Sequence, residues 1–536
     1  MSTITERLRV KPARAAAKTA KPSRVPARQP PPVITAEPEP QAAPATAAAW
    51  YDAWPYYLDS LQRSVLFLDV LRQRGDNMLA HERAGQPPLL DFEYELLLDA
   101  RTFRKPANYA LLRITRCGST HASNFERQDL RPVLVIDPRA GHGPGIGGFK
   151  HDSEVGVALH EGHPTYFAAF YPEPCPGQTL ADVIHALRAF VEEIARRHGG
   201  MAPVLYGNCQ GGWAVALLAA DCEGFDGPAV LNGSPLSYWA GAEDVNPMRL
   251  AGGLLGGEWL THLMADLGGG RLDGAWLVQN FEGLNPANTW WQKNYDLYAN
   301  VDTERERFLE FERWWSSYFF LSREEILATV ENLFIGNRLE QGQVQLDMCE
   351  MEPACVVDLK RIRNPLVIFA SSGDNITPPH QALAWLPAIY PSTEALKAAG
   401  QRIVYLINPH VGHLGIFVSA TVAQHEHRAI LENIEVFKDL APGLYEMKIG
   451  KAVETAPARG AKKTARGDTP PARHEVRFEE RRVEDLKFDY PREAFEKVAA
   501  VSQWNEWAYR TWVSPWIKWS ANPASAFIQK WAHPMR

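Results

Sequence analysis

Cysteine is scarce in this chain, and the few cysteines present do not form a recognisable framework. The 536 residues include six: Cys117, Cys175, Cys209, Cys222, Cys349 and Cys355. None forms a CxxC pair, and so few in a chain of this length do not indicate a disulfide scaffold. We therefore expect the thiols to stay reduced, as in a cytoplasmic protein.

Long hydrophobic runs and a strong excess of one charge are also missing. No stretch approaches the roughly 18 consecutive apolar residues that a spanning helix needs, and no apolar segment follows the basic N-terminus as in a secretory signal. A net charge of −7 gives no general case for binding nucleic acid. Hydrophobic residues make up 46% of the chain, enough for a large core. We expect a cytoplasmic globular protein with no membrane span and no specific nucleic-acid partner.

Composition divides off segments at both ends of the chain. Residues 1–48 are rich in Ala, Pro, Lys and Arg, which predicts a disordered basic tail. Residues 49–104 have apolar residues at three- and four-residue steps, which predicts a helical segment. Residues 442–475 are predicted to be a linker, and residues 476–536 a helical segment. Its six tryptophans either pack onto the main body or form an apolar partner surface: Trp504, Trp507, Trp512, Trp516, Trp519 and Trp531.

Between these segments, short apolar runs alternate with amphipathic stretches over residues 105–237 and 346–441. This rhythm predicts a mostly parallel sheet with helices on both faces. Over residues 238–345 the rhythm stops, and we expect an inserted helical cap without a clear strand, placed where it excludes water from a site. The expected strands are Tyr109–Ile114, Pro132–Ile136, Thr165–Tyr171, Val204–Tyr206, Pro228–Leu231, Leu366–Ala370 and Ile403–Ile407.

One strand-to-helix junction carries a chemical motif. The fourth expected strand runs into Gly207-Asn-Cys209-Gln-Gly211 and then into a helix. This is the nucleophile-elbow pattern with cysteine in place of serine, and its glycines are needed because the chain turns sharply there. GxCxG alone is a weak motif, and buried cysteines are more often inert than reactive. The prediction that Cys209 is a nucleophile therefore rests on its position between a strand and a helix.

An acid and a histidine follow the last two expected strands. Asp374 lies in the turn after the sixth strand, and His413 lies in the loop after the seventh. The chain order of nucleophile, acid and histidine is that of the α/β-hydrolase fold. We expect His413 to take the proton from Cys209, and Asp374 to orient the imidazole. His410 is the alternative base, and a helix cap or turn residue is the alternative reading of Asp374.

The predicted nucleophile also needs two hydrogen-bond donors for a developing oxyanion. The backbone N–H of Gln210, directly after Cys209, is the first expected donor. We place the second near Ala140 or Gly141, in the glycine-rich loop after the second expected strand, where glycine permits close backbone approach.

Four histidines gather in and after this loop, which raises the question of a metal. Their spacings of 9, 9 and 3 residues, with no cysteine close by in the sequence, do not match a typical zinc pattern. We expect some of them to line the pocket, and we expect neither a metal nor another cofactor. The four are His142, His151, His160 and His163.

The three motifs together resemble those of the polyhydroxyalkanoate synthases. The shared features are the GxCxG elbow, the Gly373-Asp374 turn and the Gly412-His413 loop, over about residues 105–440. The chain resembles more closely a bacterial family of unknown function, DUF3141, whose members are often labelled 3-hydroxyalkanoate synthetase. The resemblance implies an α/β-hydrolase fold, a thioester on Cys209 and 3-hydroxyacyl-CoA substrates. The glycine-rich loop departs from the synthase pattern.

Three functions remain open at this point. The first is a cysteine-dependent acyltransferase acting on an acyl thioester or polyester. The second is a hydrolase with the same three residues, either a polyester depolymerase or a thioesterase. The third is a non-catalytic protein of a granule surface, which the basic tail and the tryptophan-rich end would favour. The sequence does not choose an oligomeric state.

Overall fold

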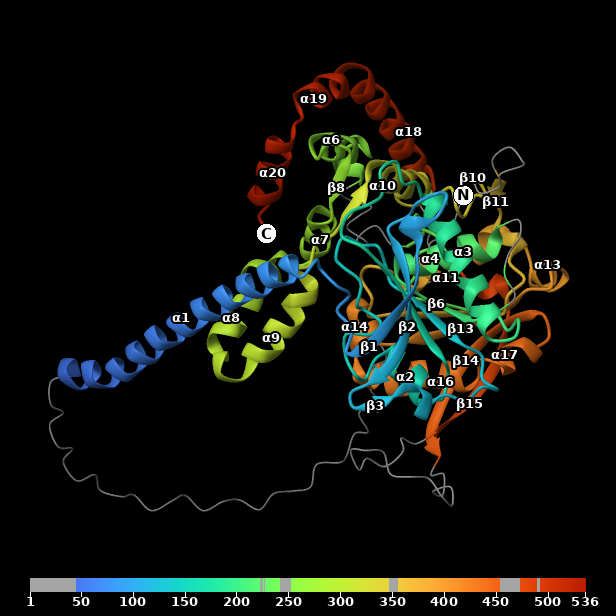
Figure 1. Cartoon of the computed structure of the whole chain (residues 1–536), viewed down its shortest axis with the longest axis horizontal. Helices are drawn as coiled ribbons and strands as arrows, with labels where there is room; N and C mark the ends of the chain where they lie inside the picture. Colours follow the sequence, from blue (N-terminus) through green and yellow to red (C-terminus); the bar gives the residue numbers. More distant parts are fainter. Residues whose placement is uncertain are drawn as a thin grey trace, which may run out of the picture. The chain divides into compact units, whose positions relative to one another are not determined.

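The computed structural model describes residues 45–221, 225, 227–241, 252–346, 355–453, 473–488 and 492–536 (Figure 1). The chain divides into two units, Met1–Gln62 and Arg63–Arg536. Helix α1 (Ala45–Arg83) begins in the first unit and ends in the second. The sheet, its helices and the candidate site all belong to the second unit. Of the predicted tail, residues 1–44 lie outside the described residues.

A large, mostly parallel sheet forms the centre of the second unit. Its strand order is β1-β2-β5-β4-β6-β7-β12-β13-β14-β15, with β3 paired to β2. The pairs from β5 through β14 are parallel, and those at both ends of the sheet are antiparallel. All seven expected strands are present, and this order is that of the α/β-hydrolase fold. The bounds are β1 (Phe92–Asp99), β2 (Tyr109–Cys117), β3 (Thr120–His121), β4 (Val133–Ile136), β5 (Thr165–Phe170), β6 (Val204–Asn208), β7 (Ala229–Asn232), β12 (Leu366–Ser371), β13 (Arg402–Asn408), β14 (Gly443–Val453) and β15 (Arg473–Arg481).

Helices cover both faces of the sheet, as predicted. Successive side chains of a strand point to opposite faces, and in β4 Leu134 belongs to one buried core while Val133 and Val135 belong to the other. Burial on both faces explains why these strands read as continuous apolar runs. One face carries α3 (Leu180–Arg197), α4 (Gln210–Ala220) and α11 (Pro379–Leu383); the other carries α2 (Glu154–His160), α14 (His413–Val418) and α16 (Arg428–Glu432) (Figure 1).

The sheet extends further at both ends than the sequence predicted. The segment expected to be helical over residues 49–104 is helical only to Arg83, and residues 92–99 form β1. The alternation of apolar and acidic residues from Phe92 to Glu95 is the two-residue period of a half-exposed strand. The predicted linker likewise begins with β14, which pairs with β13, and β15 precedes the C-terminal helices. Residues 454–472 lie outside the described residues.

The segment between β7 and β12 is mainly helical, as predicted for a cap. Two short antiparallel pairs were not predicted: β8 (Arg271–Asp273) with β9 (Phe320–Ser322), and β10 (Val344–Leu346) with β11 (Cys355–Val357). Strands of three residues are too short to show an alternating pattern. The described helices are α6 (Trp259–Leu267), α7 (Ala275–Glu282), α8 (Lys293–Ala299), α9 (Val301–Trp315) and α10 (Arg323–Thr329).

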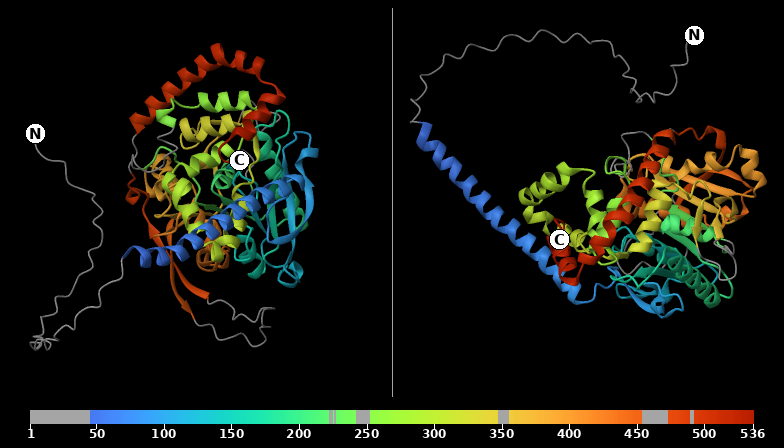
Figure 2. Two further views of the ribbon diagram at one scale, coloured as in Figure 1. Left: turned by 90° about the vertical axis from the view of Figure 1, so that its left-hand side faces the viewer. Right: turned by 90° about the horizontal axis from the view of Figure 1, so that it is seen from above.

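Three helices follow β15 and run beside α6 in each view (Figures 1 and 2): α18 (Arg492–Ala508), α19 (Ser514–Ser520) and α20 (Pro523–Ala532). Their attachment is partly polar, because the hydroxyls of Tyr509 and Ser514 donate to the buried Asp266 carboxylate at 3.0 and 2.6 Å. Phe495 of α18 also stacks on Trp239. The six tryptophans of the segment are 39 to 84% exposed, so the alternative in which they pack onto the main body is wrong. Among the described helices, none combines the length and the apolar character needed to cross a membrane.

A buried ion pair joins the loop after β4 to helix α10, and its removal is expected to destabilise the chain. Glu325 pairs with Arg139 and accepts a hydrogen bond from Gln178 at 3.0 Å. Glu325→Ala leaves the Arg139 charge buried without its carboxylate, so the free energy of unfolding should fall by about 3–5 kcal/mol. Glu324→Ala, on the exposed face of the same helix, should change it by less than about 0.5 kcal/mol. Equal effects in urea denaturation would contradict this role.

Candidate functional site

Cys209 lies between β6 and α4 in a backbone conformation that is rare for a side-chain-bearing residue. Its φ is +48° and its ψ is −116°. Such a conformation persists only where the surrounding structure enforces it. The N–H of Cys209 donates to the carbonyl oxygen of Asn232 at 2.8 Å, which fixes the turn against the end of β7.

The two glycines of the elbow leave no room for a side chain, as the motif predicted. A Cβ on Gly207 would lie 2.6 Å from Cα of Gly212. A Cβ on Gly211 would lie 2.4 Å from the carbonyl oxygen of Ile136, at the end of β4. Both distances are far shorter than van der Waals contact, so the turn requires glycine at both positions.

His413 and Asp374 meet at the carboxyl edge of the sheet. The Nδ1 atom of His413 is 2.7 Å from Oδ2 of Asp374, and both side chains are buried. The other carboxylate oxygen accepts the backbone N–H groups of Ile376 and Thr377, each at 2.8 Å. The acid is thus held from both sides, and the imidazole is left with Nε2 available for a second partner.

The structure brings His413, and not His410, to the acid. A Cβ on Gly373 would lie 2.3 Å from the carbonyl oxygen of His410, so the two loops touch through their backbones. The hydroxyl of Ser371 donates to the carbonyl oxygen of Val411 at 2.5 Å and ties the same loops together. The side chain of His410 is exposed.

Charge at His413 is controlled by its two neighbours. Burial alone lowers the pKa of the His413 imidazole, but attraction to Asp374 and then to Cys209 outweighs it and raises the pKa to about 10. Hydrogen bonds to both neighbours act in the same direction. The thiol of Cys209 therefore lies beside an imidazole that is held in its charged form, as in a thiolate–imidazolium pair.

The site is covered. Cys209 is 6% exposed and His413 7% exposed. Tyr238 at the start of the inserted segment is buried, and its pKa is raised by that burial and further by the nearby Cys209. The ring of Tyr238 packs edge-on against that of Phe334, with 4.4 Å between the ring centroids. Two hollows elsewhere on the described surface, one beside Trp290 and the other beside α18, contain neither Cys209 nor His413.

The residues predicted for the oxyanion hole are Gln210, Ala140 and Gly141. Gln210 is the first residue of α4, directly after Cys209, and Ala140 is buried. Gly141 has φ +107°, and its carbonyl oxygen accepts the N–H of Phe319 at 2.9 Å. A Cβ there would lie 2.3 Å from the carbonyl oxygen of Gly274, so this glycine is needed for packing against the inserted segment. Donation to an oxyanion remains a prediction.

The sequence reasoning missed a buried polar network beneath the elbow. Glu154, the first residue of α2, accepts hydrogen bonds from the side chains of Asn208 and Asn232. Asn232 also donates to Oδ1 of Asn208 at 3.0 Å. The two asparagines lie opposite each other at the ends of β6 and β7. An asparagine at the end of each of two apolar strands was the one sequence signal of a polar network here. Nothing in the sequence connected these asparagines to Glu154.

A second buried carboxyl lies at the end of β4. Burial raises the pKa of Asp137 to about 7, against the opposing effect of the three backbone N–H groups that its carboxylate accepts, from Gly145, Ile146 and Gly147. The pKa of Glu154 is also raised by burial, and Asp137 adds to this. Burial thus raises the pKa of both acids, and at Asp137 the backbone N–H groups partly oppose it.

The four histidines of the sequence separate into different surroundings. Burial lowers the pKa of His142 to about 4, and the nearby His413 lowers it further; the ring lies 4.3 Å from that of Trp314. His142 is thus the one of the four with a described interaction at the site. His163 bonds the Arg131 carbonyl oxygen at 2.7 Å. The remaining two, His151 and His160, meet each other.

The close approach at Gly211 generates a test of the elbow. Gly211→Ala places a methyl group against the Ile136 carbonyl, so the turn must shift or the helix must move away. We expect a loss of about 1–3 kcal/mol in the free energy of unfolding, with slower alkylation of Cys209. Gly75→Ala in α1, where a Cβ meets nothing within 4 Å, should instead stabilise by up to about 1 kcal/mol. Unchanged alkylation in Gly211→Ala would mean that the elbow does not position the thiol.

Two curated proteins are similar to the chain. An "Uncharacterized protein in ackA 5'region" of Rhizobium meliloti is 45% identical over 495 residues, which is 90% of this chain and 65% of the relative. The chain therefore spans slightly less than two thirds of that relative's length. The "Poly(3-hydroxyalkanoate) polymerase subunit PhaC" of Haloferax mediterranei is 25% identical over 155 residues, which is 28% of each protein.

Among solved structures, a carboxylesterase of Nitrososphaera gargenis matches with a TM-score of 0.36 and 13% identity, over 65% of this chain and all of that one. The fold assignment rests on the strand order described above. The sequence profile of the family described as "Protein of unknown function (DUF3141)" matches residues 59–536. The chain belongs to this family, and it combines the family's sequence with an α/β-hydrolase fold and a buried cysteine, histidine and aspartate at the edge of the sheet.

Proposed function

We propose that the chain is a cysteine-dependent acyltransferase that acts on 3-hydroxyacyl thioesters through an acyl-enzyme on Cys209. The observation that carries the proposal is the geometry of the site. A cysteine on a strained elbow lies beside His413, which is bonded to the buried Asp374 at 2.7 Å. In this assignment His413 is the base, Asp374 orients and stabilises its charged form, and the N–H of Gln210 is one oxyanion donor.

The proposed reaction has two halves. In the first, the proton of Cys209 resides on His413, as in a thiolate–imidazolium pair, and the sulfur attacks the thioester carbonyl; the bond to the leaving thiol breaks, and that thiol takes the proton from His413. In the second, the hydroxyl of a further 3-hydroxyacyl group gives its proton to His413 and attacks the acyl-enzyme carbonyl. The new ester is released, and the proton returns to the Cys209 sulfur.

Burial favours acyl transfer over hydrolysis. Cys209 is 6% exposed and interacts with the buried Tyr238, so few waters can approach the carbonyl of an acyl group on Cys209. A substrate hydroxyl delivered with its own acyl chain brings binding energy that water lacks. The similarity to the polymerase subunit of Haloferax mediterranei supports the same class of chemistry.

The test is release of coenzyme A from 3-hydroxybutyryl-CoA by the full chain, with polymer assayed in parallel. Cys209→Ala should abolish release, whereas Cys175→Ser, at a half-buried free cysteine, should keep it. Release together with polymer supports the proposal, and release without polymer makes the chain a thioesterase. If there is no release and Cys209 also resists alkylation, the nucleophile is excluded and a non-catalytic role on a granule surface is favoured.

The raised pKa of His413 predicts a pH dependence of stability. Because the folded-state pKa is raised from 6.5 to about 10, the contribution of the charged imidazole is complete below about pH 6.5 and is lost as the pH rises toward 10. His413→Gln should therefore lower the free energy of unfolding more at pH 6.5 than at pH 10. His410→Gln, at an exposed residue of the loop before α14, should change it by less than about 0.5 kcal/mol. A larger effect of His413→Gln at pH 10 would contradict the assignment.

A further inference from the structure

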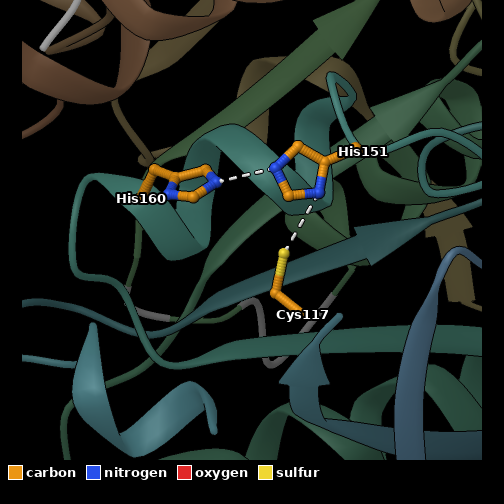
Figure 3. A group of neighbouring side chains, drawn as sticks. All are labelled: Cys117, His151 and His160. Atoms are coloured by element: carbon orange, nitrogen blue, oxygen red, sulfur yellow. Dashed lines mark hydrogen bonds between the residues drawn. The ribbon is translucent and has the colours of Figure 1, made fainter. Parts of the chain in front are cut away.

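Three side chains from separate parts of the chain converge beside the sheet, on residues that the reaction does not use (Figure 3). Cys117 is the last residue of β2, His151 lies in the loop before α2, and His160 is the last residue of α2. The sulfur of Cys117 is 3.3 Å from Nδ1 of His151, and Nε2 of His151 is 3.4 Å from Nε2 of His160. One candidate ligand atom from each residue lies within 4.8 Å of the others.

From this arrangement we propose that Cys117, His151 and His160 bind one transition-metal ion, and that Zn²⁺ is the ion their donor set fits best. One thiolate and two imidazoles are the donors that zinc prefers. Zinc–sulfur and zinc–nitrogen bonds of about 2.3 and 2.0–2.1 Å place tetrahedral ligand atoms roughly 3.3–3.6 Å apart. His151 faces Cys117 through Nδ1 and His160 through Nε2, so one ion would take a single nitrogen of His151. The three ligand atoms lie within 4.8 Å of one another, and modest side-chain rotations would bring them to the tetrahedral separation.

The charges around the cluster suit a cation. Asp91 lies near Cys117, and Asp152 lies near His160. The positive Arg428 near His160 is paired with Glu161 at 2.6 Å, so its charge is largely balanced. Binding would release the Cys117 thiol proton to solvent and leave the imidazoles neutral, with the fourth position open to water on the exposed side.

The ion would link β2 to both ends of α2. His151 lies two residues before Ser153, whose side chain caps α2, and His160 ends the same helix. The first residue of α2 is Glu154, which holds the two asparagines beneath the elbow. These three residues are distinct from Cys209, His413 and Asp374 of the proposed reaction. Cys117 is 34 residues before His151 in the sequence, which is why the histidine spacing alone did not reveal it.

The test uses the full chain, stripped with a chelator, dialysed against micromolar ZnCl₂ and analysed for bound metal. We expect one equivalent of zinc, bound at least about 100-fold more weakly by Cys117→Ser and His160→Ala. Co²⁺ in place of zinc should give a thiolate-to-metal absorption that Cys117→Ser removes. Cys209→Ala and Cys175→Ser should both keep the metal, which separates this site from the reaction site.

Three results would overturn the proposal. The wild-type chain retains no zinc, or His160→Ala binds it as tightly as wild type, or Cys209→Ala loses it, which would place the ion at the reaction site. Because Cys117 is buried, Cys117→Ser is compared with wild type by circular dichroism before binding is measured. If that variant does not fold, His160→Ala decides, since its side chain is exposed.

Discussion

Cys209 holds a backbone conformation that costs a non-glycine residue roughly 1–3 kcal/mol, and the hydrogen bonds around it keep it there. Its N–H is bonded to the end of β7, and the neighbouring Asn208 is bonded to Glu154. Glu154 also holds Asn232, so one buried carboxyl ties together the ends of two strands and the start of α2. Because the interior is closely packed, this arrangement has little freedom to relax.

The ionisable groups near the site are driven in opposite directions by their surroundings. The pKa of His413 is raised by Asp374 and Cys209 against the effect of burial, whereas burial lowers the pKa of His142. Burial likewise keeps Asp137 and Glu154 toward the neutral form. The surroundings thus favour the charged form of His413, whereas burial disfavours the charged forms of the other three groups. Such a separation of pKa values among neighbours is typical of sites that move protons.

The strands that are buried on both faces of the sheet could be predicted from the sequence. Strands such as β4 and β12 are continuous apolar runs between turn residues. The elbow motif was recognisable because a side chain at Gly207 or Gly211 would clash with the neighbouring backbone. The outer strands escaped prediction because their half-exposed residues alternate with charge. β14 was not predicted because it lies in a stretch whose composition is typical of a linker.

Within the site, sequence reasoning found residues but not all of their neighbours. His410 lies three residues before His413, the first residue of α14, and contacts of Gly373 and Ser371 with the intervening loop decide which of the two reaches the acid. Glu154 and Cys117 are distant in the chain from the residues they meet, so no spacing connects them. The surroundings of Trp504 and its neighbours depend on how the terminal helices attach, which involves hydroxyls on Asp266 and a stacked Phe495.

The two strands added beyond β13 also determine where the sheet stops. The outermost strand, β15, carries the exposed side chains of Glu475, Arg477 and Glu479 at every second position. A further strand could pair with its free backbone groups only by stripping water from these charges. Alternating charge on an outer strand is a common protection against edge-to-edge aggregation. The polar composition that prevented prediction of β15 thus also protects the edge of the sheet from pairing with further strands.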